Sequence, residues 1–269
     1  MSTPVAGRSG GPTAPGSSGR ADAVTGGGAG GSAVDKSAGA VREMFTGVAP
    51  RYDLLNHLLS GALDFVWRRR AAAALGLGAG ARVLDLCSGT GDQAMAVARR
   101  GPRVAAADFC LPMLTRSRRK FAALARAGRG RGRAAPLAAD ALALPFPPAS
   151  FDGATVSFGL RNVENLDAGL RALAASLRPG GRLAVLEFAL PGNRLLRRLY
   201  LVYFRRVLPA IGRLLSPRGS AYDYLPASVL EFPQRRGFTE RLERAGFREA
   251  RWRDLAGGTV CLYTATRRG

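Results

Sequence analysis

Short apolar runs alternate with longer segments of helical periodicity between Arg82 and Phe188. The runs predicted to be strands are Arg82–Leu86, Arg103–Asp108, Ala134–Ala139, Phe151–Ser157 and Arg182–Phe188. The segments predicted to be helices are Asp92–Arg100, Pro112–Ala127 and Asn165–Leu177. Strands that alternate with helices of roughly ten to fifteen residues are typical of βαβ units. The pattern therefore predicts an α/β fold with a doubly wound, mainly parallel sheet, whose ligands bind at the carboxyl ends of the strands.

Further helical and strand patterns flank this alternating region. The segments that predict a helical lead-in, or cap, are Met44–Val48, Leu54–Leu59 and Val66–Leu75. After the last parallel strand, Leu195–Leu215 interleaves apolar residues with arginines, and Phe238–Gly246 predicts a short helix. Two β-like runs, Glu249–Leu255 and Thr259–Thr266, are joined through Gly257-Gly258. They predict a C-terminal antiparallel hairpin at the end of the sheet.

The first forty residues differ in composition from the rest of the chain. They hold 11 of the 35 glycines, with many Ala and Ser residues and no aromatic residue. Such a segment cannot bury enough apolar surface to offset the entropy lost on ordering. We therefore expect residues 1–40 to form a disordered tail and residues 41–269 to form one folded domain.

The charge balance is strongly positive, and arginine supplies almost all of it. Lys and Arg number 40 against 19 Asp and Glu, which gives a net charge of +21. Strong basicity favours nucleic acid, an anionic membrane surface or acidic ligands as partners. A GC-rich genome produces the same bias toward Arg, Ala and Gly, so the charge alone selects no function.

The number and spacing of cysteine and histidine residues and the length of the apolar runs exclude further classes of protein. The three cysteines form no C-x-x-C pair and His57 is the one histidine, which excludes a disulfide scaffold and a His/Cys zinc site, so no metal is expected. No run approaches the roughly 18 apolar residues of a membrane span. We expect a cytoplasmic protein. For Leu195–Leu215 two hypotheses stay open: packing within the cap, or peripheral contact with the inner face of the membrane.

Glycines and acids stand at three successive strand ends. The loop Gly89-Thr90-Gly91 follows the first strand, where glycines let the backbone approach a ligand closely. Asp108 ends the second strand nineteen residues after Gly89, and its carboxylate can accept hydrogen bonds from ribose hydroxyls. Asp140-Ala141 follows the third strand, where an acid can accept from an adenine amino group. Together these positions predict an adenosine-binding site.

This arrangement, with the Pro179-Gly180-Gly181 turn, resembles the class I S-adenosylmethionine-dependent methyltransferases. A closer resemblance, over about Val41 to Arg267, is to the menaquinone/ubiquinone C-methyltransferase family. It is carried by Ala49–Asn56, Leu144–Phe146, Ser157–Val163, Leu186–Phe188 and Tyr224–Val229. The resemblance implies S-adenosyl-L-methionine as methyl donor. The family's contacts to it correspond to Thr90, Asp108, Asp140, Ala141 and Ser157, beside Gly89 and Gly91 of the glycine loop.

The resemblance also implies methylation of a ring carbon of a prenylated quinol. We expect Arg161 and Asn162 to hold the quinol oxygens and Tyr52 to close over them, with Arg161 stabilising a developing phenolate. The competing interpretation makes Arg161 a surface ion-pair residue and Tyr52 a packing residue. His57 is interpreted as an exposed or core-edge residue rather than as the base.

Several alternatives stay open at this point. The family methylates naphthoquinols and benzoquinols, and we favour demethylmenaquinol over the benzoquinol step of ubiquinone biosynthesis. A nicotinamide-dependent oxidoreductase fits the glycine spacing but leaves Asp140 without a purpose. The basic loop Gly128–Arg133 suggests an RNA-binding protein or RNA methyltransferase, although no aromatic residue interleaves with it for base stacking, so nucleic acid is disfavoured. A homodimer is also left open.

Overall fold

The computed structural model describes residues 35–128, 130–207 and 220–269. The predicted tail therefore lies outside the described residues up to Val34, and so does part of the Leu195–Leu215 segment. Helix α1 spans Ala38–Val48, and the Ser37 hydroxyl accepts a hydrogen bond from the Ala40 amide as its N-cap. The expected boundary at residue 40 is wrong, because residues 38–40 already belong to this helix.

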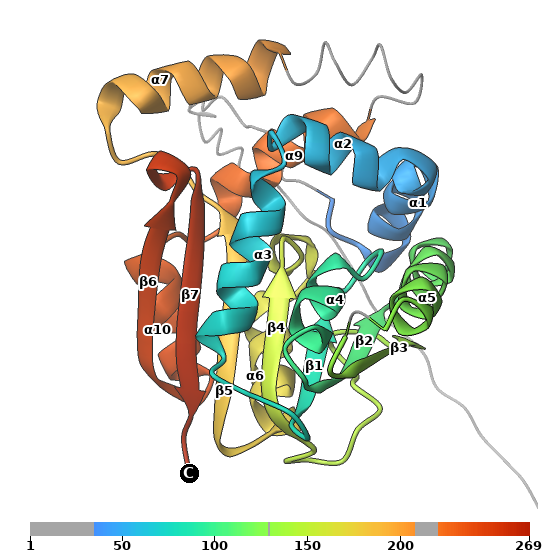
Figure 1. Cartoon of the computed structure of the whole chain (residues 1–269). Helices are drawn as coiled ribbons and strands as arrows, with labels where there is room; N and C mark the ends of the chain where they lie inside the picture. The colour runs from blue at the N-terminus through green and yellow to red at the C-terminus, as the bar shows by residue number, and fades with distance from the viewer. Residues whose placement is uncertain (1–34, 129, 208–219) are drawn as a thin grey trace, which may run out of the picture. The chain divides into compact units, whose positions relative to one another are not determined.

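A seven-stranded sheet forms the centre of the domain (Figure 1), in the order β3-β2-β1-β4-β5-β7-β6. Its strands are β1 Arg82–Leu86, β2 Arg103–Asp108, β3 Arg133–Ala138, β4 Phe151–Ser157, β5 Leu177–Phe188, β6 Phe247–Leu255 and β7 Val260–Arg267. The first five strands run parallel, and β7 lies antiparallel to both β5 and β6. This confirms the mainly parallel doubly wound sheet and its C-terminal antiparallel hairpin.

Helices cover both faces of the sheet, and others lie beyond the carboxyl ends of the strands (Figure 1). Besides α1 they are α2 Tyr52–Leu59, α3 Leu63–Ala74, α4 Asp92–Ala98, α5 Leu111–Arg126, α6 Leu166–Ser176, α7 Arg194–Val202, α9 Ser220–Glu231 and α10 Arg236–Arg244. Short helical turns are η1 Ala49–Arg51, η2 Leu160–Asn162, the π-helical η3 Tyr203–Val207 and η4 Ala256–Gly258. Within these ranges no helix combines the length and apolar character needed to cross a bilayer.

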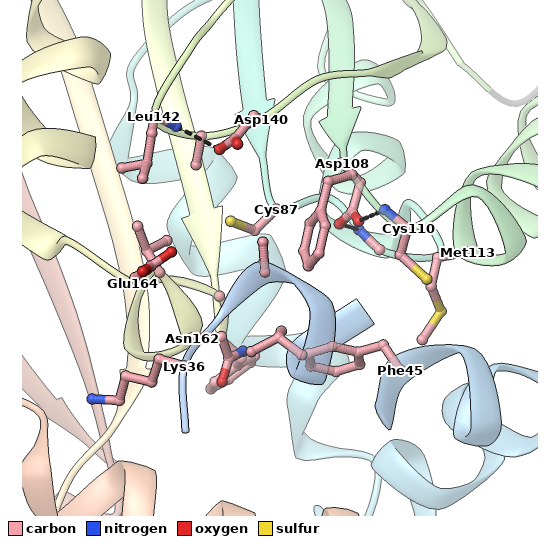
Figure 2. Close-up of a pocket in the computed structure, with 18 of the residues that line it drawn as sticks. Lys36, Phe45, Cys87, Asp108, Cys110, Met113, Asp140, Leu142, Asn162 and Glu164 are labelled. Atoms are coloured by element: carbon pink, nitrogen blue, oxygen red, sulfur yellow. Dashed lines mark hydrogen bonds between the residues drawn. The ribbon is translucent and has the colours of Figure 1, made fainter. Parts of the chain in front are cut away.

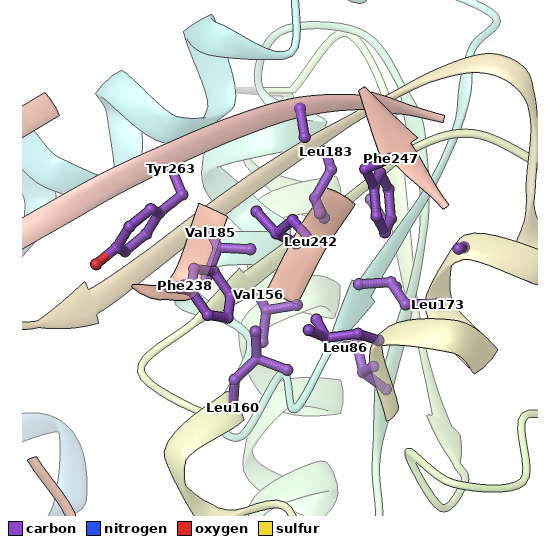
Figure 3. Packing of buried hydrophobic residues seen from close by; sticks show 14 of the residues in the cluster. Leu86, Val156, Leu160, Leu173, Leu183, Val185, Phe238, Leu242, Phe247 and Tyr263 are labelled. Atoms are coloured by element: carbon purple, nitrogen blue, oxygen red, sulfur yellow. The ribbon is translucent and has the colours of Figure 1, made fainter. Parts of the chain in front are cut away.

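Two apolar clusters hold the helices on the sheet. On one face, Leu173 of α6 and Phe238 and Leu242 of α10 pack against strand residues such as Val185 (Figure 3). On the other face, the second cluster takes its helical members from α3, α4 and α5. These include Trp67, Ala71, Val97 and Phe121. Each fully buried large side chain contributes about 1.5–3 kcal/mol of transfer free energy. The two clusters therefore hold the helices on the sheet and fix the position of the sheet edge at which the parallel strands end.

Strand β5 departs from the sequence prediction, and helix α9 was not predicted. The predicted strand began at Arg182, whereas β5 begins at Leu177 because Leu177 pairs with Phe151 across an irregularity in the ladder. The Pro179-Gly180-Gly181 turn signal thus lies inside the strand. Helix α9 contains Pro226, which disguised its helical character in the sequence.

Gly91 is the N-cap of α4 and has a φ of 86°. A Cβ atom there would lie 2.5 Å from Cζ of Phe121 and 3.0 Å from Cβ of Ser117. Helix α5 therefore packs against this turn at a distance that only glycine permits.

We expect Gly91→Ala to lower the free energy of unfolding by about 1–3 kcal/mol more than Gly180→Ala does. Gly180 is a matched control because its φ is also positive, at 76°, and no atom lies within 4 Å of a Cβ built there. Both variants thus incur backbone strain, and only Gly91→Ala adds overlap with α5. Urea denaturation measures both, and equal losses would contradict the close approach.

Candidate functional site

A pocket of about 790 Å³ opens at the carboxyl ends of β1, β2 and β4, beside α1 (Figure 2). Seven residues predicted from the sequence line it: Gly89, Asp108, Asp140, Ala141, Ser157, Asn162 and Tyr52. They come from the ends of β1 to β4, from η2 and from α2, so the fold brings together residues as far apart in the sequence as Tyr52 and Asn162. This is where a doubly wound sheet binds its ligand.

Asp108 is the acid at the end of β2 and is 8% exposed. Its Oδ2 accepts a hydrogen bond from the Gly89 amide at 2.8 Å, and its Oδ1 accepts one from the Cys110 amide at 2.8 Å. Burial raises the pKa of this carboxyl above its usual value, while the backbone amides of Cys110, Gly89 and Phe109 oppose the rise. The amides fix the carboxylate in the pocket wall, where each oxygen keeps a further lone pair for a ligand hydroxyl.

Three further polar residues line the pocket: Asp140, Ser157 and Asn162. The turn after β3 is held by Oδ1 of Asp140, which accepts from the Leu142 amide at 2.8 Å (Figure 2). Oγ of Ser157 and Oδ1 of Asn162 are buried and have no hydrogen-bond partner among the described residues. Since buried polar atoms are nearly always paired, these two atoms indicate that a polar ligand completes the pocket.

Thr90 and Gly91 do not line this pocket, although the sequence placed them among the cofactor residues. Oγ1 of Thr90 donates to Oδ1 of Asp53 at 2.5 Å and accepts from Nζ of Lys120 at 3.1 Å. Lys120 also lies 2.8 Å from Asp53 and 2.7 Å from Asp92. This charged cluster joins α2 to the glycine loop and to α5. Thr90 and Gly91 therefore support the shape of the loop on the side away from the pocket.

His57 lies one helical turn after Asp53, on the same side of α2. Its Nδ1 lies 2.9 Å from Oδ2 of Asp64, and its ring stacks on Phe65 with centroids 4.3 Å apart. The histidine side chain is 25% exposed. These contacts agree with the interpretation of His57 as a core-edge residue. Within the described part of the chain, no group of three His, Cys, Asp or Glu side chains is arranged to hold a metal ion.

A second cavity of about 770 Å³ adjoins the first. Four residues line both cavities: Phe45, Tyr52, Phe158 and Asn162. The second cavity adds an apolar wall and two arginines. The apolar residues are Met44, Val48, Leu55, Trp67, Phe188 and Leu225. The two spaces therefore meet at the turn that follows β4.

Arg161 lines the second cavity and is 8% exposed, so it does not lie at the surface, although it forms the ion pair that the competing interpretation expected. Its Nη1 lies 3.0 Å from Oε2 of Glu187, and it also donates to the carbonyl of Phe158. Its guanidinium lies over the Phe188 ring at 5.3 Å, and its Nε has no partner among the described residues. Burial raises the pKa of Glu187, and the Arg161 charge opposes that rise.

Two residues of this cavity were missed by sequence reasoning. Arg68 of α3 is 8% exposed, and its guanidinium lies 5.4 Å from the centre of the Phe158 ring. The hydroxyl of Tyr224, from α9, is buried and has no partner within the described ranges, and burial raises its pKa to about 12. Arg68 stands among three consecutive arginines, a pattern that carries no signal. Tyr224 lay in a segment quoted only for its resemblance.

Solved structures share the fold of this chain. The chain aligns with the [4+2]-cyclase SpnF at a TM-score of 0.58 and 18% identity, covering 85% of this chain and 96% of that one. A SAM-dependent methyltransferase from Thermotoga maritima gives 0.57 and 16%, covering 84% and 99%. With the pocket at the ends of β1, β2 and β4, this fold is that of the class I S-adenosylmethionine-dependent methyltransferases.

Sequence comparison identifies the family. The model of the ubiE/COQ5 methyltransferase family matches residues 33–267. A ubiquinone/menaquinone biosynthesis C-methyltransferase UbiE from Geobacter sulfurreducens is 44% identical over 83% of this chain and 87% of its own length. A demethylmenaquinone methyltransferase from a Mycobacterium species is 43% identical over 87% and 96%. The chain belongs to the ubiE/COQ5 methyltransferase family, which argues against the oxidoreductase and RNA alternatives.

Asp85 lies beneath the glycine loop, in β1, and is fully buried. It accepts a hydrogen bond from Oγ1 of Thr155 at 2.8 Å, and its Oδ2 has no partner among the described residues. Burial raises its pKa from 3.8 to about 7, and the Thr155 hydroxyl opposes that rise. In the folded protein this carboxyl therefore stays protonated in mildly acidic solution, where an unfolded chain would release the proton.

Because its folded-state pKa is the higher one, Asp85 makes the free energy of unfolding fall as the pH rises between about 4 and about 7. The full rise in the pKa of Asp85 corresponds to a change of about 4 kcal/mol in the free energy of unfolding, as an order of magnitude. We expect Asp85→Asn, which mimics the protonated form, to remove this part of the slope. Urea denaturation from about pH 5 to about pH 8 measures it. Glu243→Gln, at an exposed site, is the control for losing one carboxyl, and an unchanged slope in Asp85→Asn would contradict the assignment.

Proposed function

We propose that the protein transfers a methyl group from S-adenosyl-L-methionine to a ring carbon of a prenylated quinol, namely demethylmenaquinol, the last step of menaquinone biosynthesis. The observation that carries the proposal is the wall of Tyr52, Phe158 and Asn162, which lines both cavities. A donor in the first cavity and an acceptor ring in the second meet across this wall. Such placement supplies the proximity and alignment that methyl transfer requires.

The first cavity suits S-adenosyl-L-methionine, which when bound supplies an electrophilic methyl group on its sulfonium sulfur. Asp108 would accept from the ribose hydroxyls, since amides hold its carboxylate in the wall. Asp140 and Ala141 would receive the adenine, and the unpartnered Oγ of Ser157 offers a further hydrogen bond. Gly89 leaves space for the ligand, because a Cβ there would meet nothing within 4 Å. Thr90 and Gly91 would act through the shape of the loop.

The second cavity suits a quinol. Loss of a hydroxyl proton from the quinol to solvent would increase electron density on the ring carbons, one of which would attack the methyl carbon as the bond of that carbon to sulfur breaks. The attacked ring carbon would then lose its own proton to solvent, which restores the aromatic ring. The Arg161 guanidinium favours the resulting phenolate by its charge, and Glu187 and the Phe158 carbonyl hold that guanidinium in place. The unpartnered Nε of Arg161 is a donor for a quinol oxygen. The unpartnered hydroxyl of Tyr224 is a second donor in the same cavity.

Tyr52 and Asn162 would position the acceptor at the junction of the cavities. Tyr52 is half-buried, its ring contacts Phe45 edge-on at 6.0 Å, and burial raises the pKa of its hydroxyl. It is therefore neutral at physiological pH and can close the junction to water while donating one hydrogen bond. The unpartnered Oδ1 of Asn162 can accept from the acceptor's hydroxyl.

A bicyclic head group agrees best with the second cavity. Met44, Val48, Leu55 and Trp67 give it a broad apolar wall, which favours a fused aromatic ring over a smaller polar one. The name of the mycobacterial relative, demethylmenaquinone methyltransferase, points the same way. A homodimer stays a prediction.

The direct test is methyl transfer from labelled S-adenosyl-L-methionine to chemically reduced demethylmenaquinol, with a demethylated benzoquinol and RNA as parallel acceptors. We expect label in the naphthoquinol, with the benzoquinol labelled weakly or not at all. Equal label in both quinols would show a dual role in menaquinone and ubiquinone biosynthesis. Label in RNA alone, or none while the donor still binds, would overturn the proposed substrate.

We expect Arg161→Lys to lower kcat by about a hundredfold or more, while the Kd for S-adenosyl-L-methionine changes by less than about threefold. Lysine keeps a positive charge beside Glu187 but loses the fork of donors, so folding is preserved better than in Arg161→Ala. The control is Arg178→Lys, because Arg178 pairs with Asp152 at 2.8 Å on the surface. Labelled transfer and calorimetry give the two quantities. Equal loss of turnover and donor affinity in Arg161→Lys would contradict its role at the acceptor.

A further inference from the structure

Helix α7 lies beyond the carboxyl ends of the strands (Figure 1), and several of its apolar side chains are exposed. Leu195 is 68% exposed, Leu199 60% and Val202 51%. Their spacing of four and then three residues places them on one side of the helix. An amphipathic helix normally buries such a stripe, so this face is the reverse of the expected arrangement.

Two residues on the other side of α7 have neighbours within the domain. The side chain of Leu196, 37% exposed, closely approaches Gly257 at the turn of the C-terminal hairpin. Tyr200 contacts Phe204 of η3, the next turn of the chain, with ring centroids 4.3 Å apart, and Phe204 is 5% exposed. No residue of α7 is buried, and these contacts leave the Leu195, Leu199 and Val202 face unexplained.

The charges of α7 select the kind of partner. The helix carries Arg194, Arg197 and Arg198, all exposed, and contains no Asp or Glu. Arginines that border an exposed apolar stripe match the boundary between lipid acyl chains and anionic headgroups. A protein partner would have to supply an apolar groove rimmed by acids. The net charge of +21 adds long-range attraction to an anionic surface.

Helix α2 lies at the same end of the domain, beyond the carboxyl ends of the strands (Figure 1). Its Leu54 is 66% exposed and its Leu58 62%, one turn apart. The opposite side of this helix faces the second cavity through Tyr52 and Leu55. Helix α2 thus lies between the proposed acceptor site and the solvent.

We infer that α2 and α7 form a docking face for an anionic lipid bilayer, in which Leu54, Leu58, Leu195, Leu199 and Val202 enter the acyl boundary and the arginines of α7 contact phosphates. This inference rests on the proposed function for its purpose, because the prenyl chain of the acceptor is dissolved in the bilayer. Docking at this end places the second cavity next to the surface from which the head group is taken.

The test is co-sedimentation of the full chain with phosphatidylcholine vesicles and with vesicles that also contain phosphatidylglycerol. We expect binding to the anionic vesicles that weakens with salt. Leu195→Ser with Leu199→Ser, and separately Leu54→Ser with Leu58→Ser, should each lower the partition coefficient by about tenfold or more. Arg194→Glu with Arg198→Glu should abolish the preference for phosphatidylglycerol.

Matched controls lie on the edge strand β6. Trp252→Ser removes a 43% exposed apolar side chain, and Arg251→Glu with Arg253→Glu reverses two exposed arginines. Neither change touches α2 or α7, so the apolar control should bind as the wild type does. The arginine control changes the net charge equally, and it should leave most of the phosphatidylglycerol preference intact. Equal effects from the β6 and α7 charge reversals would overturn the assignment of this face.

Activity separates this inference from the proposed function. The leucine variants should methylate a short-chain demethylmenaquinol in detergent at the wild-type rate but lose at least about tenfold with a long-chain acceptor in vesicles. Wild-type protein that methylates the short-chain quinol without binding vesicles would overturn the docking face alone. Vesicle binding without methylation of any quinol would overturn the function alone. Light scattering that shows a dimer lost in Leu195→Ser with Leu199→Ser, with no vesicle binding, would identify a second copy as the partner and overturn the lipid assignment.

Discussion

The buried ion pair between Arg161 and Glu187 is the interaction on which the two-cavity site depends. Glu187 is fully buried near the end of β5, and Arg161 is 8% exposed in the turn after β4. Removing one partner of such a pair typically costs about 3–5 kcal/mol, because the other is left as an uncompensated buried charge. The pair therefore fixes the turn that carries Phe158 and Asn162 against the sheet, and these two residues form the wall between the cavities together with Tyr52.

Hydrophobic periodicity and turn residues were enough to predict the sheet, because its parallel strands are short apolar runs with turn residues on both sides. The bounds of β1, β2 and β4 agree with the prediction to the residue. The beginning of β5 was wrong because Pro179-Gly180-Gly181 signals a turn locally, whereas Leu177 finds a partner in Phe151, a contact that no local pattern contains. The sequence is right where the cause is local and fails where pairing over distance decides.

The same distinction between local and long-range causes applies to the residues of the candidate site. The first cavity, the proposed donor site, was predictable, since Asp108, Asp140 and Ser157 stand at or just after the ends of parallel strands, and topology brings such ends together. The second cavity, the proposed acceptor site, was not, since Arg68 and Tyr224 reach it from helices separated by about 150 positions. Thr90 shows the limit of motif reasoning: it belongs to the glycine loop, yet its hydroxyl bonds Asp53 behind that loop.

Helix α2 joins these parts because consecutive helical residues point about 100° apart. Tyr52 and Leu55 face the second cavity, Asp53 contacts Thr90 and Lys120, and Leu54 faces outward. One turn of helix thus contacts the second cavity, the support of the glycine loop and the exterior. Tyr52 and Asp53 are consecutive residues of α2, so one short element supports both the glycine loop and the junction of the two cavities. The geometry of the two proposed sites is thus tied to the placement of this helix.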